Sequence, residues 1–283
     1  MKVKFRIAAV AGFALGGALF ADGEMAMRCV AHRGMWGKHM PQNTVEAIKL
    51  AYDSGATWVE TDFYHTKAGQ MVCIHGTKEL ASYTSCKKKI EDLTPEDIAT
   101  LNLGEKMRLP KTYRIPLLHQ VLAVVPKTCV LQSEIKGYSP QYADLFDAAV
   151  KAAGLSETNI VLSSFNYDAL KDFKARYPKY RPAIWLATLR RPGALDVRDV
   201  VAKCKKAGIT VYCPGITFLH PENPAHHLAD ALRAEGIDFR AFGVNSKDDL
   251  VKGKQLKISG FTTNRWRAAF DWANAIGGIS LVK

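Results

Sequence analysis

Short apolar runs alternate with amphipathic stretches along most of this chain. A run of roughly four to eight apolar residues that ends in polar ones is typical of a buried strand, whereas apolar residues three or four apart are typical of a helix. Eight such strands are predicted, at residues 27–32, 57–62, 129–134, 160–163, 183–187, 210–213, 239–244 and 258–262. Helical patterns lie between them, for example at residues 141–153, 196–207 and 224–235. This alternation predicts an α/β fold, a (β/α)8 TIM barrel.

The pattern departs from simple alternation after the second strand. Only Lys67, Ala68 and Gly69 separate the extension of that strand from another apolar run at residues 71–75. Three residues are too few for a parallel crossover, so we predict a hairpin that lies against the barrel mouth. A short insertion is predicted next, at residues 77–127.

Two helix starts carry capping signals. Asn43 is the predicted N-cap of the first helix, with Glu46 three residues later as in a capping box, and Gly55 ends that helix. Within the insertion, a helix is predicted to begin at Pro95 with Thr94 as its cap.

The first residues differ from the rest of the chain. Lys2, Lys4 and Arg6 precede an unbroken run of apolar and small residues that reaches Phe20, and Ala21 offers a small residue before a cut. This is the pattern of a secretory signal peptide, and the run is short for a membrane span. We therefore expect residues 1–21 to be removed, the protein to be periplasmic or extracellular, and residues 27–283 to form a single domain.

The charge of the chain indicates an anionic partner only weakly. The net charge is +12, and without residues 1–21 there remain 36 basic against 27 acidic residues, a net charge of +9. There is no dense basic run with interleaved aromatic residues, so nucleic acid is not an expected partner. Six cysteines permit disulfides in an exported protein, but none forms a Cys-x-x-Cys pair typical of zinc sites. Either a bridge between Cys73 and Cys86 or a free thiol at Cys86 is compatible with the sequence.

The candidate chemistry gathers at predicted strand ends. Glu60 and Asp62 are two residues apart, so both carboxylates lie on one face of their strand and provide a hard-oxygen site for Mg²⁺ or Ca²⁺. His32 and His75 can donate and accept protons beside such a cation, and the guanidinium of Arg33 suits a phosphate. Barrel enzymes carry their active sites at the carboxyl ends of the strands. Side chains predicted at those ends are His32, Glu60, Asp62, Glu134 and Lys136. The set predicts phosphodiester cleavage.

A series of short motifs follows in order along residues 28 to 266: His32-Arg33-Gly34, Asn43-Thr44, Glu60-x-Asp62, the hairpin that ends in His75, Glu134-Ile135-Lys136, Ser163-Ser164-Phe165, Val244-Asn245 and Gly260-Phe261-Thr262-Thr263. In this order the motifs resemble the glycerophosphodiester phosphodiesterase family. The resemblance implies one divalent cation held by Glu60, Asp62 and Glu134. It also implies that His32 and His75 are the acid–base pair and that Arg33 and Lys136 face the phosphate. A glycerol hydroxyl of the substrate would attack phosphorus first, giving a cyclic phosphate that water then opens.

Four positions depart from the family pattern. Gly76 follows His75 in place of Asp, Gln42 replaces the Glu before Asn-Thr, Phe242 stands where a Trp-Thr pair often begins, and Asn264 replaces a late Asp. We expect Gly76 to remove a carboxylate near His75 or the metal. Two alternatives stay open: a lipid-directed phosphodiesterase similar to the phospholipase D toxins, and a phosphate-binding module without catalysis. The insertion shows no apolar wedge that would favour contact with membrane lipid.

Other polar and aromatic residues have structural interpretations. Five histidines are expected to be structural: His65, His119, His220, His226 and His227. Trp185, Trp266 and Phe242 either wall the pocket or pack in the core, and the second interpretation is the commoner one for aromatic residues.

Overall fold

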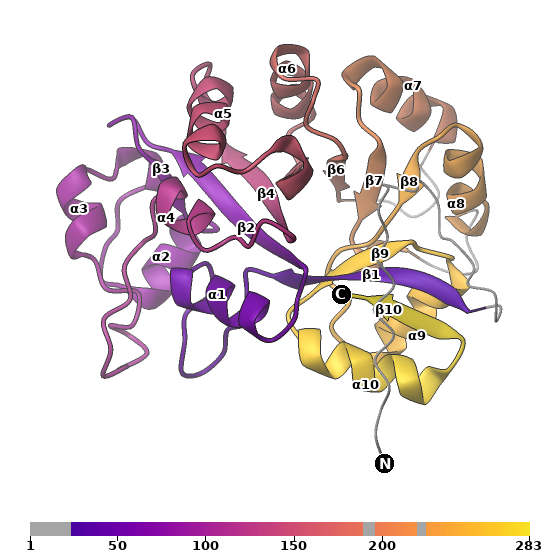
Figure 1. Cartoon of the computed structure of the whole chain (residues 1–283), viewed down its shortest axis with the longest axis horizontal. Coiled ribbons are helices and arrows are strands. Elements are labelled where there is room, and N and C mark those ends of the chain that lie inside the picture. Colours follow the sequence, from indigo (N-terminus) through magenta and orange to yellow (C-terminus); the bar gives the residue numbers. More distant parts are fainter. Residues whose placement is uncertain (1–23, 189–195, 220–224) are drawn as a thin grey trace.

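A nearly closed barrel of parallel strands is the centre of the molecule. The computed structural model describes residues 24–188, 196–219 and 225–283 (Figure 1). In the described residues, eight strands form the barrel: β1 (Met25–His32), β2 (Trp58–His65), β4 (Val130–Gly137), β5 (Ile160–Ser164), β6 (Ala183–Ala187), β7 (Val211–Pro214), β8 (Asp238–Phe239) and β9 (Gly260–Thr263). β9 pairs in parallel with β1, and the Ala241 N–H donates to the carbonyl of Gly260 between β8 and β9, at 3.1 Å. The predicted TIM barrel is confirmed.

Two further strands lie outside this ring. β3 (Met71–Cys73) pairs antiparallel with β2, with Phe63 opposite Cys73, so the predicted hairpin is confirmed. β10 (Ile279–Val282) extends the sheet at the start of β1, where Met25 pairs with Ile279.

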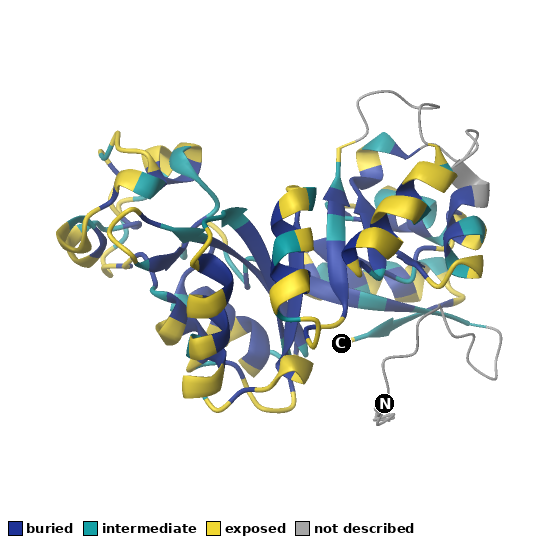
Figure 2. Cartoon of the chain, turned by 90° about the horizontal axis from the view of Figure 1, so that it is seen from above, coloured by how far each residue is buried: buried dark blue, intermediate teal, exposed yellow. Residues whose placement is uncertain are grey.

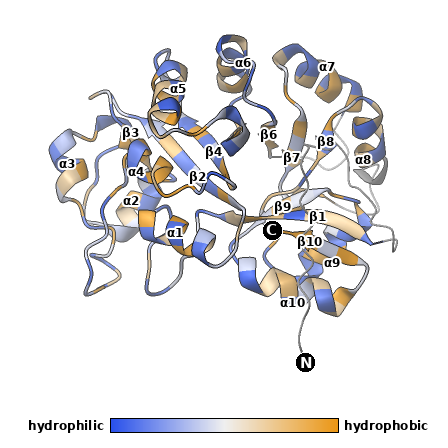
Figure 3. Ribbon diagram, viewed as in Figure 1, coloured by the Kyte–Doolittle hydropathy of each residue, from blue (hydrophilic) through white to orange (hydrophobic). Residues whose placement is uncertain are grey.

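Helices cover the outside of the barrel. They are α1 (Val45–Asp53), α5 (Tyr142–Ala152), α6 (Tyr167–Arg176), α7 (Val197–Ala207), α8 (Ala225–Ala234), α9 (Lys247–Gln255) and α10 (Trp266–Ile276). Their inner faces are buried and their outer faces exposed (Figure 2), because apolar and polar residues alternate at helical spacing (Figure 3). Among the described residues, none of these helices has the length and hydropathy needed to cross a membrane.

Alternate residues of each strand enter two different cores. Ile184 and Leu186 of β6 belong to a cluster formed by strand residues and therefore fill the barrel interior. Trp185, between them, packs in the larger cluster that also contains helix residues such as Phe146. Because side chains alternate along a strand, the interior face of β2 carries Trp58 and, further on, both acidic residues of that strand. The strand pattern therefore directs these carboxylates into the barrel.

Most of the segment at residues 77–127 packs on a core of its own beside β3 (Figure 1), whereas its last helix packs on the main core with Leu118, Val121 and Leu122. It contains α2 (Thr77–Tyr83), η1 (Ile90–Asp92), α3 (Pro95–Thr100) and α4 (Leu118–Leu122). Thr94 caps α3 in a capping box with Asp97, and Pro95 is in the first turn, as predicted. This core includes Val72, Ile74, Leu80, Ile90, Leu93, Ile98, Leu103, Tyr113 and Ile115. It anchors the loop between β3 and α2, which carries His75.

Two expectations about local structure are wrong. Thr44, and not Asn43, is the N-cap of α1, since its side chain accepts from the Ala47 N–H. Asn43 has a left-handed backbone with φ 57°, and its side chain contacts β2 instead. The predicted strand at residues 239–244 is regular only at Asp238–Phe239, because the chain beyond it pairs by single bridges, Ala241 with Phe261 and Phe242 with Gly215.

Some of the residues considered above lie outside the described part of the chain. Residues 1–21, His220 and the side chains of His226 and His227 lie outside the described residues. All six cysteines are described and all are free thiols: Cys29, Cys73, Cys86, Cys129, Cys204 and Cys213.

Candidate active site at the open end of the barrel

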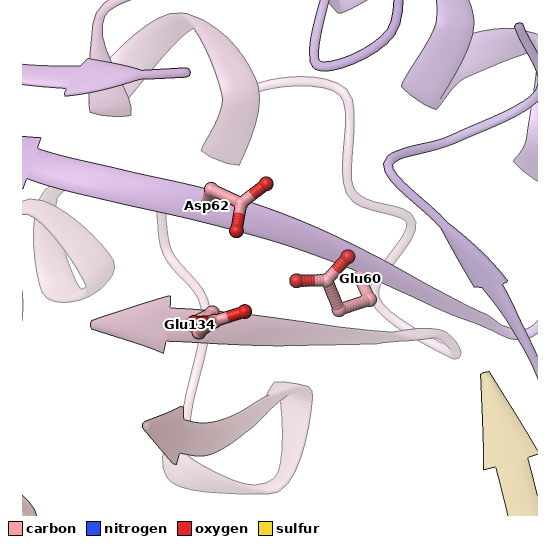
Figure 4. A group of neighbouring side chains, drawn as sticks. All are labelled: Glu60, Asp62 and Glu134. Atoms are coloured by element: carbon pink, nitrogen blue, oxygen red, sulfur yellow. The ribbon is translucent and has the colours of Figure 1, made fainter. Parts of the chain in front are cut away.

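Three carboxylates converge at the carboxyl ends of β2 and β4. Glu60 and Asp62 share the interior face of β2, and Glu134 lies beside Asp62 in the register of the neighbouring strand β4 (Figure 4). One oxygen from each residue can be chosen so that all three atoms lie within 4.8 Å of one another. The residues are 2%, 0% and 5% exposed. The structure brings together all three carboxylates that were expected to hold the cation.

Burial of this acidic cluster disturbs its protonation. Burial, and then the charges of Asp62 and Glu134, hold the pKa of Glu60 well above its usual range. Burial and the charge of Asp62 raise the pKa of Glu134 to about 8. Burial would also raise the pKa of Asp62, but the charges of Arg33 and Lys136 outweigh it and lower that pKa to about 2. Three ionised carboxylates would therefore carry more negative charge than the surrounding residues stabilise.

Two cations lie against these carboxylates. Arg33 Nε is 3.1 Å from Asp62 Oδ2, and Lys136 Nζ is 2.6 Å from Glu134 Oε1 and 3.3 Å from Asp62 Oδ1. Glu60 Oε1 is buried and has no hydrogen-bond partner in the described part of the chain. A buried anionic oxygen without a partner is costly, and a donor set of carboxylate oxygens suits a hard divalent cation. These residues fit such an ion.

Both candidate histidines lie beside the cluster. His32 is the last residue of β1, and its Nε2 is 3.7 Å from Glu60 Oε2. His75 lies in the loop that leaves β3, close enough to Asp62 for that charge to favour its protonated form. Burial, and next the charge of Arg33, lower the pKa of His32 to about 4, and burial lowers that of His75 to about 4 despite Asp62. The site thus combines two imidazoles, three carboxylates and two cations.

The comparison with known proteins agrees with this geometry. Residues 32–268 match the model of the glycerophosphoryl diester phosphodiesterase family. The chain belongs to this family.

Similar proteins support the assignment over most of the chain. A glycerophosphodiester phosphodiesterase of Caldanaerobacter subterraneus subsp. tengcongensis is 27% identical over 243 residues, covering 83% of this chain and 93% of that protein. A glycerophosphodiester phosphodiesterase structure from Parabacteroides distasonis has a TM-score of 0.70 at 21% identity, covering 88% of this chain and 98% of the other. An Oleispira antarctica phosphodiesterase, solved with the product sn-glycerol-3-phosphate, has a TM-score of 0.71 at 20% identity, covering 86% and 96%. At these identities the two structures show a shared barrel fold.

Two residues that hold the site were not assigned to it from the sequence. Asn43 Nδ2 donates to Asp62 Oδ2 at 2.9 Å, and Asn43 Oδ1 accepts the Asp62 N–H at 3.3 Å. Asn264 Oδ1 lies 2.6 Å from His32 Nδ1. Asparagine is one of the few residues that tolerate a left-handed backbone, and this property is the one feature of the sequence that could have indicated a role for Asn43 other than helix capping. Asn264 was recognised only as a departure from the family pattern.

Although Gly76 provides no carboxylate, another carboxylate lies near His75. Glu79 Oε2 accepts a hydrogen bond from the backbone N–H of His75. Glu79 is in the first turn of α2 and is 7% exposed. A carboxylate therefore lies beside His75, but it comes from a position three residues after Gly76.

The three aromatic candidates lie in two different places. Trp266 and Trp185 pack in the core, whereas Phe242 lies at the mouth of the barrel. Trp266 is buried and stacks edge-on with Phe270 of α10, and Trp185 packs between the barrel and the helices. Phe242 instead contacts Phe165, with ring centroids 5.4 Å apart, and Phe165 is 41% exposed. Lys136 Nζ is 5.5 Å from the centre of the Phe165 ring. Of the three aromatic residues considered, Phe242 alone belongs to the rim around the polar site.

Proposed function

We propose that this protein is a divalent-cation-dependent phosphodiesterase that hydrolyses glycerophosphodiesters to an alcohol and glycerol 3-phosphate. The observation that carries the proposal is the convergence of Glu60, Asp62 and Glu134 within 4.8 Å, in a chain that belongs to a phosphodiesterase family. The product named for the Oleispira antarctica phosphodiesterase, glycerol 3-phosphate, is the phosphate product proposed here.

The charges of the site suit a phosphodiester. Glu60, Asp62 and Glu134 would hold one Mg²⁺ or Ca²⁺ ion, which when bound would neutralise charge that develops on the phosphoryl oxygens. Three carboxylates, one divalent ion and the side chains of Arg33 and Lys136 leave one net positive charge. A phosphodiester monoanion balances it. Arg33 and Lys136 are then the side chains that face the phosphate.

Proton transfer falls to the two histidines. One imidazole accepts the proton of the attacking glycerol hydroxyl, whose oxygen forms a bond to phosphorus. The other imidazole gives a proton to the alcohol oxygen as its bond to phosphorus breaks, which releases the alcohol and leaves a cyclic phosphate. His32 and His75 then exchange roles while water opens the ring. Because their pKa values are lowered, both histidines are mostly neutral at pH 7. The histidine that acts as general base is then already in the required form, whereas the general acid must take up a proton when the substrate binds.

A substrate panel with metal titration tests the proposal. Purified protein would be incubated with glycerophosphocholine and related diesters, first with EDTA and then after addition of Mg²⁺, Ca²⁺ or Mn²⁺. We expect turnover that EDTA abolishes and a cation restores, and Glu60→Gln should not recover. Undiminished turnover in EDTA would exclude the metal role. No turnover with any diester and cation would favour a binding module, and sedimentation with liposomes together with lipid cleavage would favour the lipid-directed alternative.

Export is a separate proposal that rests on the pattern of residues 1–21. Expression of the full chain with sequencing of the mature N-terminus tests it. We expect a first residue near Asp22 in the exported fraction, and retention of Met1 in all of the protein would contradict the proposal.

A further inference from the structure

The main chain of His75 is held from both sides, by the half-buried side chain of Tyr64 and the buried side chain of Glu79. Its N–H donates to Glu79 Oε2, and its carbonyl accepts from Tyr64 Oη at 3.4 Å. Tyr64 lies on β2 and Glu79 on α2, so the two contacts join the barrel to the neighbouring segment across this peptide. A backbone fixed at both polar groups limits the directions in which the imidazole can point.

The glycine at position 76 fits this arrangement. Gly76 has φ 157° and ψ −179°, a combination that is essentially restricted to glycine. A Cβ added there would lie 3.3 Å from Tyr64 Oη, the atom that contacts His75. Gly76 is also the N-cap of α2 and contributes no capping side chain. A side chain after His75 would therefore disturb the contact from Tyr64.

Gln42 is also compatible with a carboxylate at position 79. The Gln42 side chain, 8% exposed, stabilises the charged form of Glu79 by a hydrogen bond, as does the His75 N–H. Burial, followed by the charge of Asp62, nevertheless raises the pKa of Glu79 to about 7. A second carboxylate at position 42 would add repulsion in this buried place, whereas an amide can donate. The departure at position 42 thus lies against Glu79, and the departure at position 76 lies next to His75, whose N–H donates to Glu79.

We propose that Glu79 is a positioning residue for His75, and that it supplies from α2 the carboxylate that the family pattern has directly after this histidine. The inference rests on the proposed function, in which His75 transfers a proton. Glu79 acts through the main chain of His75 and does not touch the substrate.

Three variants separate positioning from stability. Glu79→Ala removes the acceptor, and we expect kcat to fall roughly 10- to 100-fold with little change in KM, since small displacements of a reacting group cost this much. Glu79→Gln keeps a carbonyl oxygen as acceptor and should restore most of kcat. Thr84→Ala is the matched control, because Thr84 Oγ1 donates to the Leu80 carbonyl at the other end of α2 and does not contact His75. It should lower Tm and leave kcat unchanged.

Amide hydrogen exchange at His75 provides a readout that is independent of turnover. Glu79→Ala should accelerate exchange of this one amide, whereas Thr84→Ala should not. If Glu79→Ala keeps the wild-type kcat, or if both alanine variants lose activity in proportion to their loss of Tm, the inference is overturned while the proposed function stands. If the wild-type protein turns over no phosphodiester, the proposed function fails and the role of Glu79 fails with it.

Discussion

His32 Nδ1 lies 2.6 Å from Oδ1 of Asn264, a residue 232 positions later in the chain. An amide oxygen only accepts hydrogen bonds, so Nδ1 of a neutral His32 carries the proton. Nε2 is then unprotonated and is the nitrogen nearer to Glu60. Asn264 is held in turn, since its backbone N–H donates to Asn245 Oδ1 at 2.8 Å. The end of β9 therefore selects the tautomer of a histidine at the end of β1.

Removal of the side-chain amide of Asn264 should reduce kcat. In Asn264→Ala the imidazole loses its acceptor and can change tautomer or rotate, so we expect kcat to fall roughly tenfold or more. Steady-state kinetics on the best diester of the panel would measure this. Wild-type kcat in this variant would show that Asn264 has no part in orienting His32.

Asn264→Asp should change the pH dependence. A carboxylate beside Nδ1 favours the imidazolium, so it raises the pKa of His32 from the value of about 4 that burial and Arg33 impose. The limb of the kcat/KM profile that reports His32 should therefore move to higher pH. Superimposable profiles of the wild type and the variant would contradict this.

Asn43 should contribute to cation affinity through Asp62. Its amide donates to Asp62 Oδ2 at 2.9 Å, and groups that hold a ligand in this way contribute roughly 10- to 100-fold to metal affinity. Asn43→Gly is the informative variant, because glycine accepts the left-handed backbone at φ 57° while the amide is removed. Calorimetric titration with Mg²⁺ or Ca²⁺ would measure the loss. Glu46→Ala, on the adjoining helix and paired with the exposed Lys111, is a control that should bind normally.

Cation binding should strengthen as pH rises. In the metal-free site, burial and the charge of Asp62 raise the pKa of Glu134 to about 8, so below that pH a proton must leave before the carboxylate can bind a cation. Glu60 must also lose its proton, because burial and the neighbouring charges raise its pKa too, so the apparent affinity should increase as pH rises to about 8 and beyond, with protons released on binding. Titrations in buffers of different ionisation enthalpy between pH 6 and 9 would detect these protons. A pH-independent affinity without proton release would contradict the prediction.

Asp147 should stabilise the outer layer of the barrel. This buried side chain on α5 accepts from Tyr180 Oη at 2.7 Å and pairs with Lys151 at 2.7 Å and Lys179 at 2.6 Å. Burial would raise its pKa, but these partners lower it to about 2. Because the folded pKa lies below the unfolded value of about 3.9, the stabilisation is complete above that pH and is lost as pH falls towards 2.

Asp147→Asn should therefore lower the free energy of unfolding by about 2 kcal/mol at pH 7. The difference from the wild type should shrink in acid, which denaturant titrations at pH 7 and pH 3 would show. Asp144→Asn is the matched control, since Asp144 lies on the same helix but is exposed. An exposed ion pair contributes about 0–1 kcal/mol. Equal losses in the two variants would contradict the prediction.

The sequence by itself was sufficient for the barrel and for most of the chemical groups. Apolar runs that alternate with amphipathic stretches predict the order of strands and helices. A strand that is buried on both faces is a continuous apolar run, whereas a helix that is buried on one face has apolar residues three or four positions apart. The spacing of Glu60 and Asp62 places both on one face of a strand, because side chains alternate along it. The position of Glu134 at a strand end places it at the same end of the barrel. These inferences need only local geometry and the rule for parallel strands.

Only the tertiary structure decided how these groups are held. Asn43 is a reasonable N-cap by its sequence position, but in the folded chain its amide serves Asp62 and Thr44 caps the helix instead. Glu79 is an ordinary first-turn residue of α2 until the hairpin brings His75 within reach of its carboxylate. Asn264 meets His32 only because the barrel closes between β9 and β1. Each contact depends on two separately positioned elements, and a periodic pattern within one segment carries no information about the distance to the other.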